Sequence, residues 1–196
     1  MIPTNSREFL DFLYYVVGQQ KYDFDVCGLW KQGEERISTK WRKYSEVIFP
    51  LDVNQDLPTN VNQRQILPCE VILDIEEKDK LEPIIQIIKK GELYYSLWFS
   101  GSRGYHISLL FDRDLTMEEK VIIIDFFGTD IQKSGDRTLI ALEWSPHWKT
   151  GNPKELLESN YFNGDEIGTN HFDFIEGSSG IQKPIITKSN KTLKYD

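Results

Sequence analysis

Strand-like and helix-like patterns alternate in a fixed order between residues 70 and 145, and this order restricts the fold more than any other feature. Short runs rich in β-branched and aromatic residues predict four strands, at residues 69–77, 93–100, 105–111 and 137–144. Apolar residues at helical spacing predict two helices, at residues 81–91 and 116–128. Gly91 and Gly128 end these helices, and Thr116 forms a capping box with Glu119. The order of elements is therefore β-α-β-β-α-β.

This order is that of the split βαβ arrangement found in ferredoxin-like and RNA-recognition-type folds. We expect an α+β fold and a single domain over residues 1–196. An N-terminal α/β lobe is expected at residues 1–65, and the split βαβ lobe at residues 66–176. Residues 177–196 form a polar segment that we expect to be loosely ordered.

The N-terminal lobe is predicted to begin with a helix at residues 6–20, with Ser6 as its N-cap. One face of this helix is apolar, and its residues are Phe9, Leu10, Leu13, Val16 and Val17. Residues 50–68 contain three prolines among many Asn, Gln and Asp residues, so we expect a loop there.

Two carboxylates lie on one face of the first predicted strand. Because side chains alternate along a strand, Asp74 and Glu76 point to the face opposite Val71, Leu73 and Ile75. Charged groups beside an apolar strand need neutralisation, and oxygen ligands of this kind suit Mg²⁺ or Mn²⁺. The alternative is that the acids mark the solvent-exposed end of the strand.

The turn "SGSRGYH" at residues 100–106 combines small residues with donors that suit an anion. Ser100 offers a hydroxyl group, Arg103 a fork of donors and His106 a further donor. A polyphosphate would fit these groups, and a purely structural hairpin is the alternative. Downstream, Lys149 precedes Thr150 and a glycine in a second candidate phosphate loop, although the residues before it do not form a P-loop pattern.

A two-metal site for phosphoryl transfer needs a further carboxylate. Spacing alone does not choose among the four candidates, which are Asp125, Asp130, Asp136 and Glu143. Asp130 follows the glycine that ends a helix, where a loop can direct it back toward the sheet.

The formal net charge of -8 argues against a general nucleic-acid coat protein, which requires a basic surface. A local basic cluster, which would bind nucleic acid or form an ordinary solvated face, contains Arg36, Lys40, Arg42 and Lys43. Two cysteines and three histidines provide no spaced zinc motif. Since no signal pattern and no apolar run of ~20 residues is present, we expect a cytoplasmic protein without a membrane partner.

Taken together, these motifs resemble the catalytic core of the archaeo-eukaryotic primase superfamily. The matching stretches are "LDIE" at 73–76, "SGSRGYH" at 100–106, Thr129-Asp130, and "SPHWKTG" at 145–151. The resemblance covers roughly residues 69–151, and its most specific parts are the second stretch and the KTG. It implies a primase fold in which an RNA-recognition-type catalytic lobe packs against the N-terminal lobe.

The resemblance also implies a function, which is template-directed nucleotidyl transfer by a DNA primase or primase-polymerase. Asp74, Glu76 and Asp130 would hold Mg²⁺ or Mn²⁺. The triphosphate of an NTP or dNTP would be bound by a second set, consisting of Ser100, Arg103, His106, Lys149 and His147. The implied partners are a single-stranded DNA template with its primer and an accessory replication or primase subunit.

The sequence departs from the family pattern at several positions. Thr129 replaces the usual apolar residue before the third acid, and Ala141 stands where relatives often carry arginine, with Arg137 nearby. Because zinc elements that help initiation are missing, the resemblance implies strand extension more directly than unaided primer synthesis. The alternatives are a catalytically weak nucleotide- or DNA-binding subunit and an RNA-recognition-type module that presents Tyr94 and Trp98 to bases.

Overall fold

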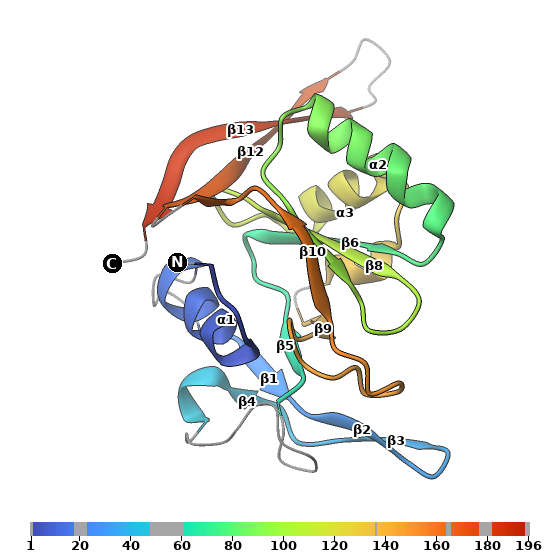
Figure 1. Cartoon of the computed structure of the whole chain (residues 1–196). Helices are drawn as coiled ribbons and strands as arrows, with labels where there is room; N and C mark the ends of the chain where they lie inside the picture. Colours follow the sequence, from blue (N-terminus) through green and yellow to red (C-terminus); the bar gives the residue numbers. More distant parts are fainter. Residues whose placement is uncertain are drawn as a thin grey trace.

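In the part of the chain that it describes, the computed structural model contains two main sheets, three α-helices and a long two-stranded ribbon (Figure 1). The structure describes residues 2–17, 23–47, 61–135, 137–163, 166–176 and 182–194. Within these residues, no helix is both long enough and apolar enough to cross a membrane.

The larger sheet has the strand order β10-β7-β8-β6. Its strands are β6 (Glu70–Ile75), β7 (Ser96–Phe99), β8 (Tyr105–Leu110) and β10 (Glu155–Ser159). Both β6 and β7 pair antiparallel with β8, so they run parallel to each other, and α2 (Lys78–Lys90) connects them. This is the predicted split βαβ unit, and α3 (Met117–Phe126) follows β8 with the expected capping box at Thr116.

The fourth strand of this sheet was predicted wrongly. Residues 139–141 do form a strand, β9 (Leu139–Ala141), but it pairs with β5 (Gln63–Gln65) in a second sheet. The strand that completes the larger sheet is β10, which lies beside β7 at the opposite edge from β6. Strand propensity is a local property, whereas the choice of partner depends on contacts between distant residues.

The second sheet has the order β4-β1-β5-β9 and combines strands from both halves of the chain. Its remaining strands are β1 (Asp25–Cys27) and β4 (Arg42–Lys43), and a hairpin of β2 (Leu29–Gln32) and β3 (Glu35–Ser38) extends from β1. Strand β5 falls inside the segment predicted as a loop, so that prediction is wrong at residues 63–65. Residues 48–60 of that segment lie outside the described residues.

The predicted N-terminal helix is helical from Ser6 to Val17, and residues 18–20 of the prediction lie outside the described residues. Helix α1 (Ser6–Phe12) continues into a single π-helical turn, η1 (Leu13–Val17). Asn5, not Ser6, is its N-cap, because the Asn5 side chain accepts the backbone N–H of Glu8. The Ser6 hydroxyl donates instead to the carbonyl of Glu143, 2.7 Å away.

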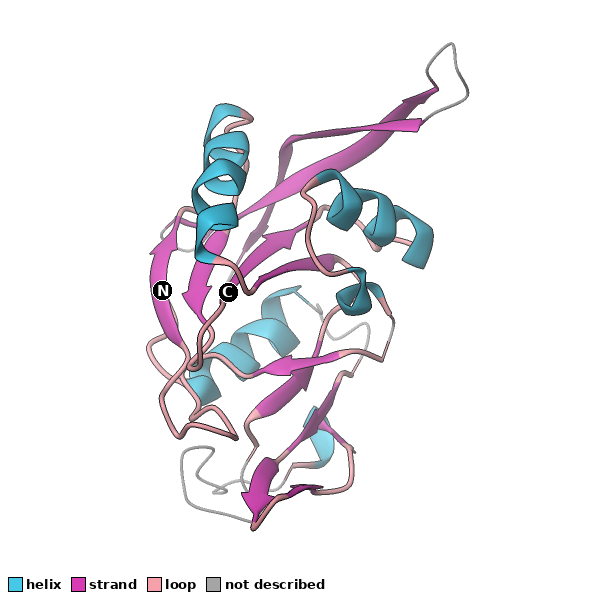
Figure 2. Ribbon diagram, turned by 90° about the vertical axis from the view of Figure 1, so that its right-hand side faces the viewer, coloured by secondary structure: helices cyan, strands magenta, loops and turns pink. Residues whose placement is uncertain are grey.

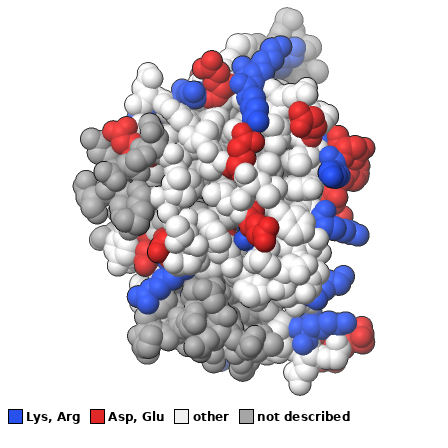
Figure 3. All heavy atoms as spheres, viewed as in Figure 1, with Lys and Arg blue, Asp and Glu red and all other residues white. Residues whose placement is uncertain are grey.

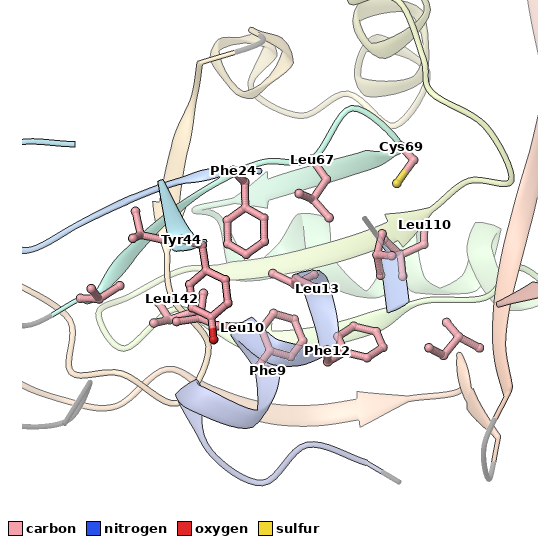
Figure 4. Packing of buried hydrophobic residues seen from close by; sticks show 14 of the residues in the cluster. Phe9, Leu10, Phe12, Leu13, Phe24, Tyr44, Leu67, Cys69, Leu110 and Leu142 are labelled. Carbon is pink, nitrogen blue, oxygen red and sulfur yellow. The ribbon is translucent and has the colours of Figure 1, made fainter. Parts of the chain in front are cut away.

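The larger sheet is covered on both faces, which gives three layers (Figure 1). Leu97 on β7 packs with α2 and α3, whereas the next residue, Trp98, points to the opposite face and joins the core around α1. Figure 4 shows this second core, in which Phe9 and Leu10 of α1 lie among residues of both sheets. Four of the five predicted apolar residues are buried, and the side chain of Val16 is not described.

The segment predicted as a loosely ordered tail is largely a strand. A short strand, β11 (Phe162–Asn163), and two long ones, β12 (Glu166–Glu176) and β13 (Gln182–Lys194), form the third sheet. Figure 2 shows β12 and β13 extending together beyond the rest of the chain. The prediction failed because many residues of this segment are polar, so the sequence shows no clear apolar alternation. The strand is held by contacts with other segments: Ile186 packs against the core formed with α2 and α3, and the Ser189 hydroxyl donates to Asp112 at 2.6 Å.

Candidate functional site

The candidate site lies on the face of the larger sheet that is turned away from α2 and α3. Val71, Leu73 and Ile75 of β6 pack with these helices, so Asp74 points to the other face, as the alternation predicted. The register of the strands places Asp74 opposite His106 on β8, and His106 opposite Trp98 on β7. Two predicted site residues from distant segments are therefore neighbours across the sheet.

The turn between β7 and β8 is a tight hairpin closed by its own serine. The Ser100 N–H donates to the Gly104 carbonyl at 3.0 Å, and the Ser100 hydroxyl accepts the Gly104 N–H at 3.3 Å. Gly101 adopts a φ of +82°, which disfavours residues with a Cβ. The turn therefore holds Arg103 at its tip, where the side chain is 77% exposed.

The loop at residues 145–151 packs directly on this turn. The Thr150 hydroxyl donates to the Gly101 carbonyl at 2.5 Å. The loop also closes on itself, since the Gly151 N–H donates to the His147 carbonyl at 2.8 Å. Two predicted phosphate-binding segments, 49 positions apart at Gly101 and Thr150, therefore meet through the backbone of Gly101.

This contact makes a substitution at Gly101 more damaging than at a comparable glycine. Gly101→Ala would place its Cβ 2.7 Å from the Asn152 carbonyl oxygen, whereas Gly151, at φ +76°, has open space around it. We expect Gly151→Ala to cost about 1–2 kcal/mol of stability from backbone strain. Gly101→Ala should cost an additional ~1–3 kcal/mol from overpacking. Urea unfolding of both variants measures the difference, and equal losses would contradict the proposed contact.

Most of the predicted site residues surround one cavity of about 410 Å³. The predicted residues that line it are Asp74, Glu76, Ser100, Arg103, His106, His147, Lys149 and Arg36. Residues that the sequence did not single out also line it, chiefly Gln63, Ser102, Lys133 and Trp148. No local pattern marks Lys133 or Gln63, because they reach the cavity only through the packing of the two sheets.

Asp130 lies in an adjoining cavity of about 350 Å³, which Asp74 and Glu76 also line. The Asp130 carboxylate caps the short turn η3 (Ile131–Ser134) and accepts the Gln132 N–H at 2.9 Å. It follows Gly128, which has a φ of +66° and ends the helical segment as expected. The two cavities therefore share the carboxylates of Asp74 and Glu76.

Two of the other candidates for a third carboxylate, Asp125 and Glu143, do not line either cavity. Asp125 is exposed on α3. Glu143 is fully buried and forms ion pairs of 2.7 Å with Arg64 and with Lys154. Burial alone would raise the pKa of Glu143, but these two cations lower it to about 2. Asp136 lies outside the described residues.

Asp74 on β6 and Glu76 directly after it already have cationic partners. The Nζ atom of Lys133 lies 3.5 Å from Asp74, and Nε2 of His106 lies 3.6 Å from the same carboxylate. Arg103 forms a 2.9 Å ion pair with Glu76. Burial raises the pKa of Asp74, and Lys133 partly offsets this effect.

His106 is buried and electrically neutral. Burial is the main reason that its pKa lies well below the usual range, and the nearby cations Lys154 and Lys133 lower it further. A neutral imidazole offers one N–H donor and one acceptor nitrogen. Its Nδ1 atom is buried and has no hydrogen-bond partner among the described residues.

The oxygen donors suit a divalent ion only as a partial set. Among the described residues, no three Asp, Glu, His or Cys side chains converge closely enough to hold a metal ion by themselves. Mg²⁺ is commonly bound by one or two carboxylates together with substrate phosphates. Asp74 and Glu76 fit that mode, because both line the cavity that also contains the candidate phosphate-binding residues.

The four residues of the predicted basic cluster lie in different surroundings, and only Arg36 lines the cavity. Arg36 lines the cavity and lies over the ring of Trp148, 5.4 Å from its centroid. Lys43 instead forms an ion pair with Asp25 at 2.9 Å. Lys40 is exposed on the connection before β4, and Arg42 is half-buried on β4 itself. Figure 3 shows Lys and Arg side chains interspersed with Asp and Glu on one face of the molecule.

The sheet does not present aromatic residues to bases as an RNA-recognition-type module would. Trp98 is completely buried, and its indole N–H donates to Ser96 at 2.8 Å. Tyr94 packs beside the core around α1 and under Lys188, whose Nζ lies 5.0 Å from the ring centroid. The alternative of a base-stacking surface formed by these two residues, which the carboxylates Asp74 and Glu76 already disfavoured, does not fit the burial of Trp98.

No protein-family model matches the chain, and no curated protein matches it. A comparison with solved structures finds similarity to the archaeo-eukaryotic primase domain of the cyanophage S-2L primase-polymerase. The TM-score is 0.47 and the sequence identity 11%, over 70% of this chain and 80% of that domain. A likeness at this level says nothing of activity, so the functional proposal depends on the geometry of the cavity.

Proposed function

We propose that this protein is a template-directed nucleotidyltransferase that extends, or also initiates, a primer strand. The observation that carries the proposal is the single cavity lined by residues of three separate segments, β6, the β7–β8 turn and the 145–151 loop. Carboxylates from the first segment face donors from the other two. A nucleoside triphosphate with a divalent ion satisfies both sets of groups at once.

The proposed nucleotide-binding residues have distinct roles. Arg103 and Lys149 supply positive charge for the triphosphate, while Ser100 and the neutral His106 supply hydrogen bonds. His147, whose pKa is lowered by burial and by neighbouring Lys149, adds a further polar group to the lining of the cavity. These groups orient the α-phosphorus, and positioning of this kind provides much of the catalysis in phosphoryl transfer.

The reaction needs no nucleophilic side chain. The primer 3′-hydroxyl oxygen forms a bond to the α-phosphorus, the bond from that phosphorus to the bridging oxygen breaks, pyrophosphate leaves, and the hydroxyl proton passes to solvent. Asp74 and Glu76 would hold Mg²⁺ or Mn²⁺, with Asp130 at the adjoining cavity. When bound, the divalent ion neutralises charge on the phosphates and acidifies the attacking hydroxyl.

The proposed partner is a single-stranded template with its primer. Arg36 over Trp148 combines a cation with a stacking surface at the edge of the cavity, a pairing that suits single-stranded nucleic acid. Since the formal net charge is -8, we expect weak binding that falls steeply with salt, and an accessory subunit would supply further affinity.

A primer-extension assay tests the proposal. Purified protein, a primed DNA template, Mn²⁺ and labelled dNTPs or NTPs should yield products whose sequence follows the template. A parallel reaction without primer measures initiation separately. Failure of extension with both nucleotide types, at protein concentrations that saturate the template, would rule out the proposed activity.

A second candidate function is a nucleotide- or DNA-binding subunit with little catalytic activity. The observation that favours it is that Lys133 and Arg103 already form ion pairs with Asp74 and Glu76. Under this alternative the protein binds triphosphate without incorporating it. Nucleotide binding by calorimetry together with negative extension assays would support this alternative over the first proposal.

Removal of the exposed arginine separates nucleotide binding from template binding. Arg103→Ala should raise the KM for nucleotide by about tenfold, since charge-assisted bonds contribute about 1.5–3 kcal/mol, while template affinity changes little. Arg113→Ala is the control, because Arg113 pairs with Glu119 away from the cavity, at 2.7 Å. A larger loss of template affinity than of nucleotide affinity would assign Arg103 to the nucleic acid instead.

A further inference from the structure

Lys133 occupies a position that the motif pattern does not assign to any residue. It lies on η3, three residues after Asp130, and its side chain enters the larger cavity while Asp130 lines the smaller one. One short turn therefore contributes a cation to one side of Asp74 and a carboxylate to the other.

The ion pair between Lys133 and Asp74 is protected from solvent. The two side chains are 24% and 20% exposed, and Nζ lies 3.5 Å from the carboxylate. The Arg103–Glu76 pair is shorter, at 2.9 Å, but its side chains are 77% and 69% exposed. Because water screens exposed pairs, the charges of Lys133 and Asp74 are screened less than those of Arg103 and Glu76.

We propose that Lys133 is an internal counter-ion: it pairs with Asp74 in the absence of nucleotide, and with the phosphates of the nucleotide once that ligand is bound. This inference builds on the proposed function. While Lys133 pairs with Asp74, its positive charge competes with a divalent ion for the same carboxylate. A polyphosphate in the cavity offers Lys133 a partner of higher charge and leaves Asp74 to the metal. Lys133 is thus a positioning residue that couples nucleotide binding to metal binding.

The exchange predicts opposite effects of one substitution on two ligands. Lys133→Gln removes the competitor, so Mn²⁺ alone should bind about tenfold more tightly, within the ~5–150-fold range typical of coupling between two sites. The same substitution removes a cation from the phosphate site, so inorganic tripolyphosphate without metal should bind at least about fivefold more weakly. A residue that only maintained the structure would weaken both.

Both affinities are measurable without any catalytic assay. Electron paramagnetic resonance follows the loss of the free Mn²⁺ signal, and calorimetry in EDTA follows tripolyphosphate. The control variant is Lys80→Gln, because Lys80 lines the adjoining cavity with Asp74 but pairs with Glu77 at 3.2 Å. It removes the same charge nearby and should change either affinity by no more than about twofold, as expected for a screened surface charge.

Three outcomes would overturn the inference. The first is unchanged or weaker Mn²⁺ binding by Lys133→Gln. The second is an equal tightening in Lys80→Gln, which would mean that only net charge matters. The third is unchanged tripolyphosphate binding. If wild-type protein extends primers while any of these is found, the counter-ion role fails and the proposed function stands. If wild-type protein neither binds Mn²⁺ nor extends primers, both fail.

Discussion

Lys154→Met is expected to lower the free energy of unfolding by about 3–5 kcal/mol, the usual cost of leaving a buried charge without its partner. Lys154 is fully buried, and its ammonium group donates to Glu143 and to the Ala141 carbonyl at 2.7 and 2.8 Å. The methionine side chain approximates the volume of lysine but provides neither charge nor donor. Urea unfolding at neutral pH measures the loss.

The loss is large because Lys154 belongs to a buried network that joins the two sheets. Arg64 on β5 donates to Glu70 on β6 at 2.7 and 2.8 Å and to Glu143 after β9 at 2.7 and 2.9 Å. Ser108 on β8 donates to Glu70 as well, at 2.8 Å. Two cations and two carboxylates balance in charge, so removing one cation leaves the network negative.

When the protein is titrated with acid, the Lys154→Met variant should also unfold at a higher pH than the wild-type protein. Glu143 has a lowered pKa in the folded protein, so it contributes stability above its unfolded value, which is lost as the pH falls toward about 2. Without Lys154 its pKa rises, and the acid transition moves upward. Lys89→Met is the control, because the Lys89–Glu158 pair is exposed and its loss should cost at most about 1 kcal/mol. Equal losses in the two variants would contradict the buried network.

Asp74→Asn is expected to reduce primer extension by about 10²–10³-fold or more, the typical cost of losing one group that stabilises transition-state charge. Asparagine keeps the shape of the side chain but carries no charge for a divalent ion. The fold should tolerate the change, because burial raises the pKa of Asp74 and so disfavours its charged form in the folded protein. Extension rates and thermal unfolding of the same preparation check both points.

The matched control for this variant is Asp125→Asn. Asp125 was an alternative candidate for the metal site, and it is exposed on α3. Its substitution should leave extension unchanged within about twofold, as for surface changes away from the site. Extension that survives the combined loss of Asp74 and Glu76 would overturn the site assignment, whatever the other variants show.

Local sequence patterns predicted the elements that a short segment can specify by itself. Alternation along β6 placed Asp74 on the face opposite Leu73, and the capping box placed the start of α3 at Thr116. The glycines of the β7–β8 turn marked a hairpin, which forms with its register between Phe99 and Tyr105. These features depend on side-chain periodicity and turn geometry, which act over a few residues.

Such local patterns did not predict which distant segments pair with each other. The segment at residues 137–144 was predicted as a strand of the larger sheet, but β9 pairs with β5 instead. Residues 182–194 were taken for a loose tail and form β13 against β12. In both cases the local propensity is compatible with several partners, and the buried contacts of the final packing select one.

The sequence by itself therefore determined the split βαβ unit and the types of residue available for a phosphate and metal site. The tertiary structure decided which of them meet. Packing of the two sheets places Lys133 beside Asp74 and withdraws Glu143 into the buried network with Arg64. The physical reason is the distance along the sequence over which each interaction acts. Side-chain periodicity and helix capping involve residues a few positions apart, whereas burial and charge pairing depend on groups that only the folded chain brings together.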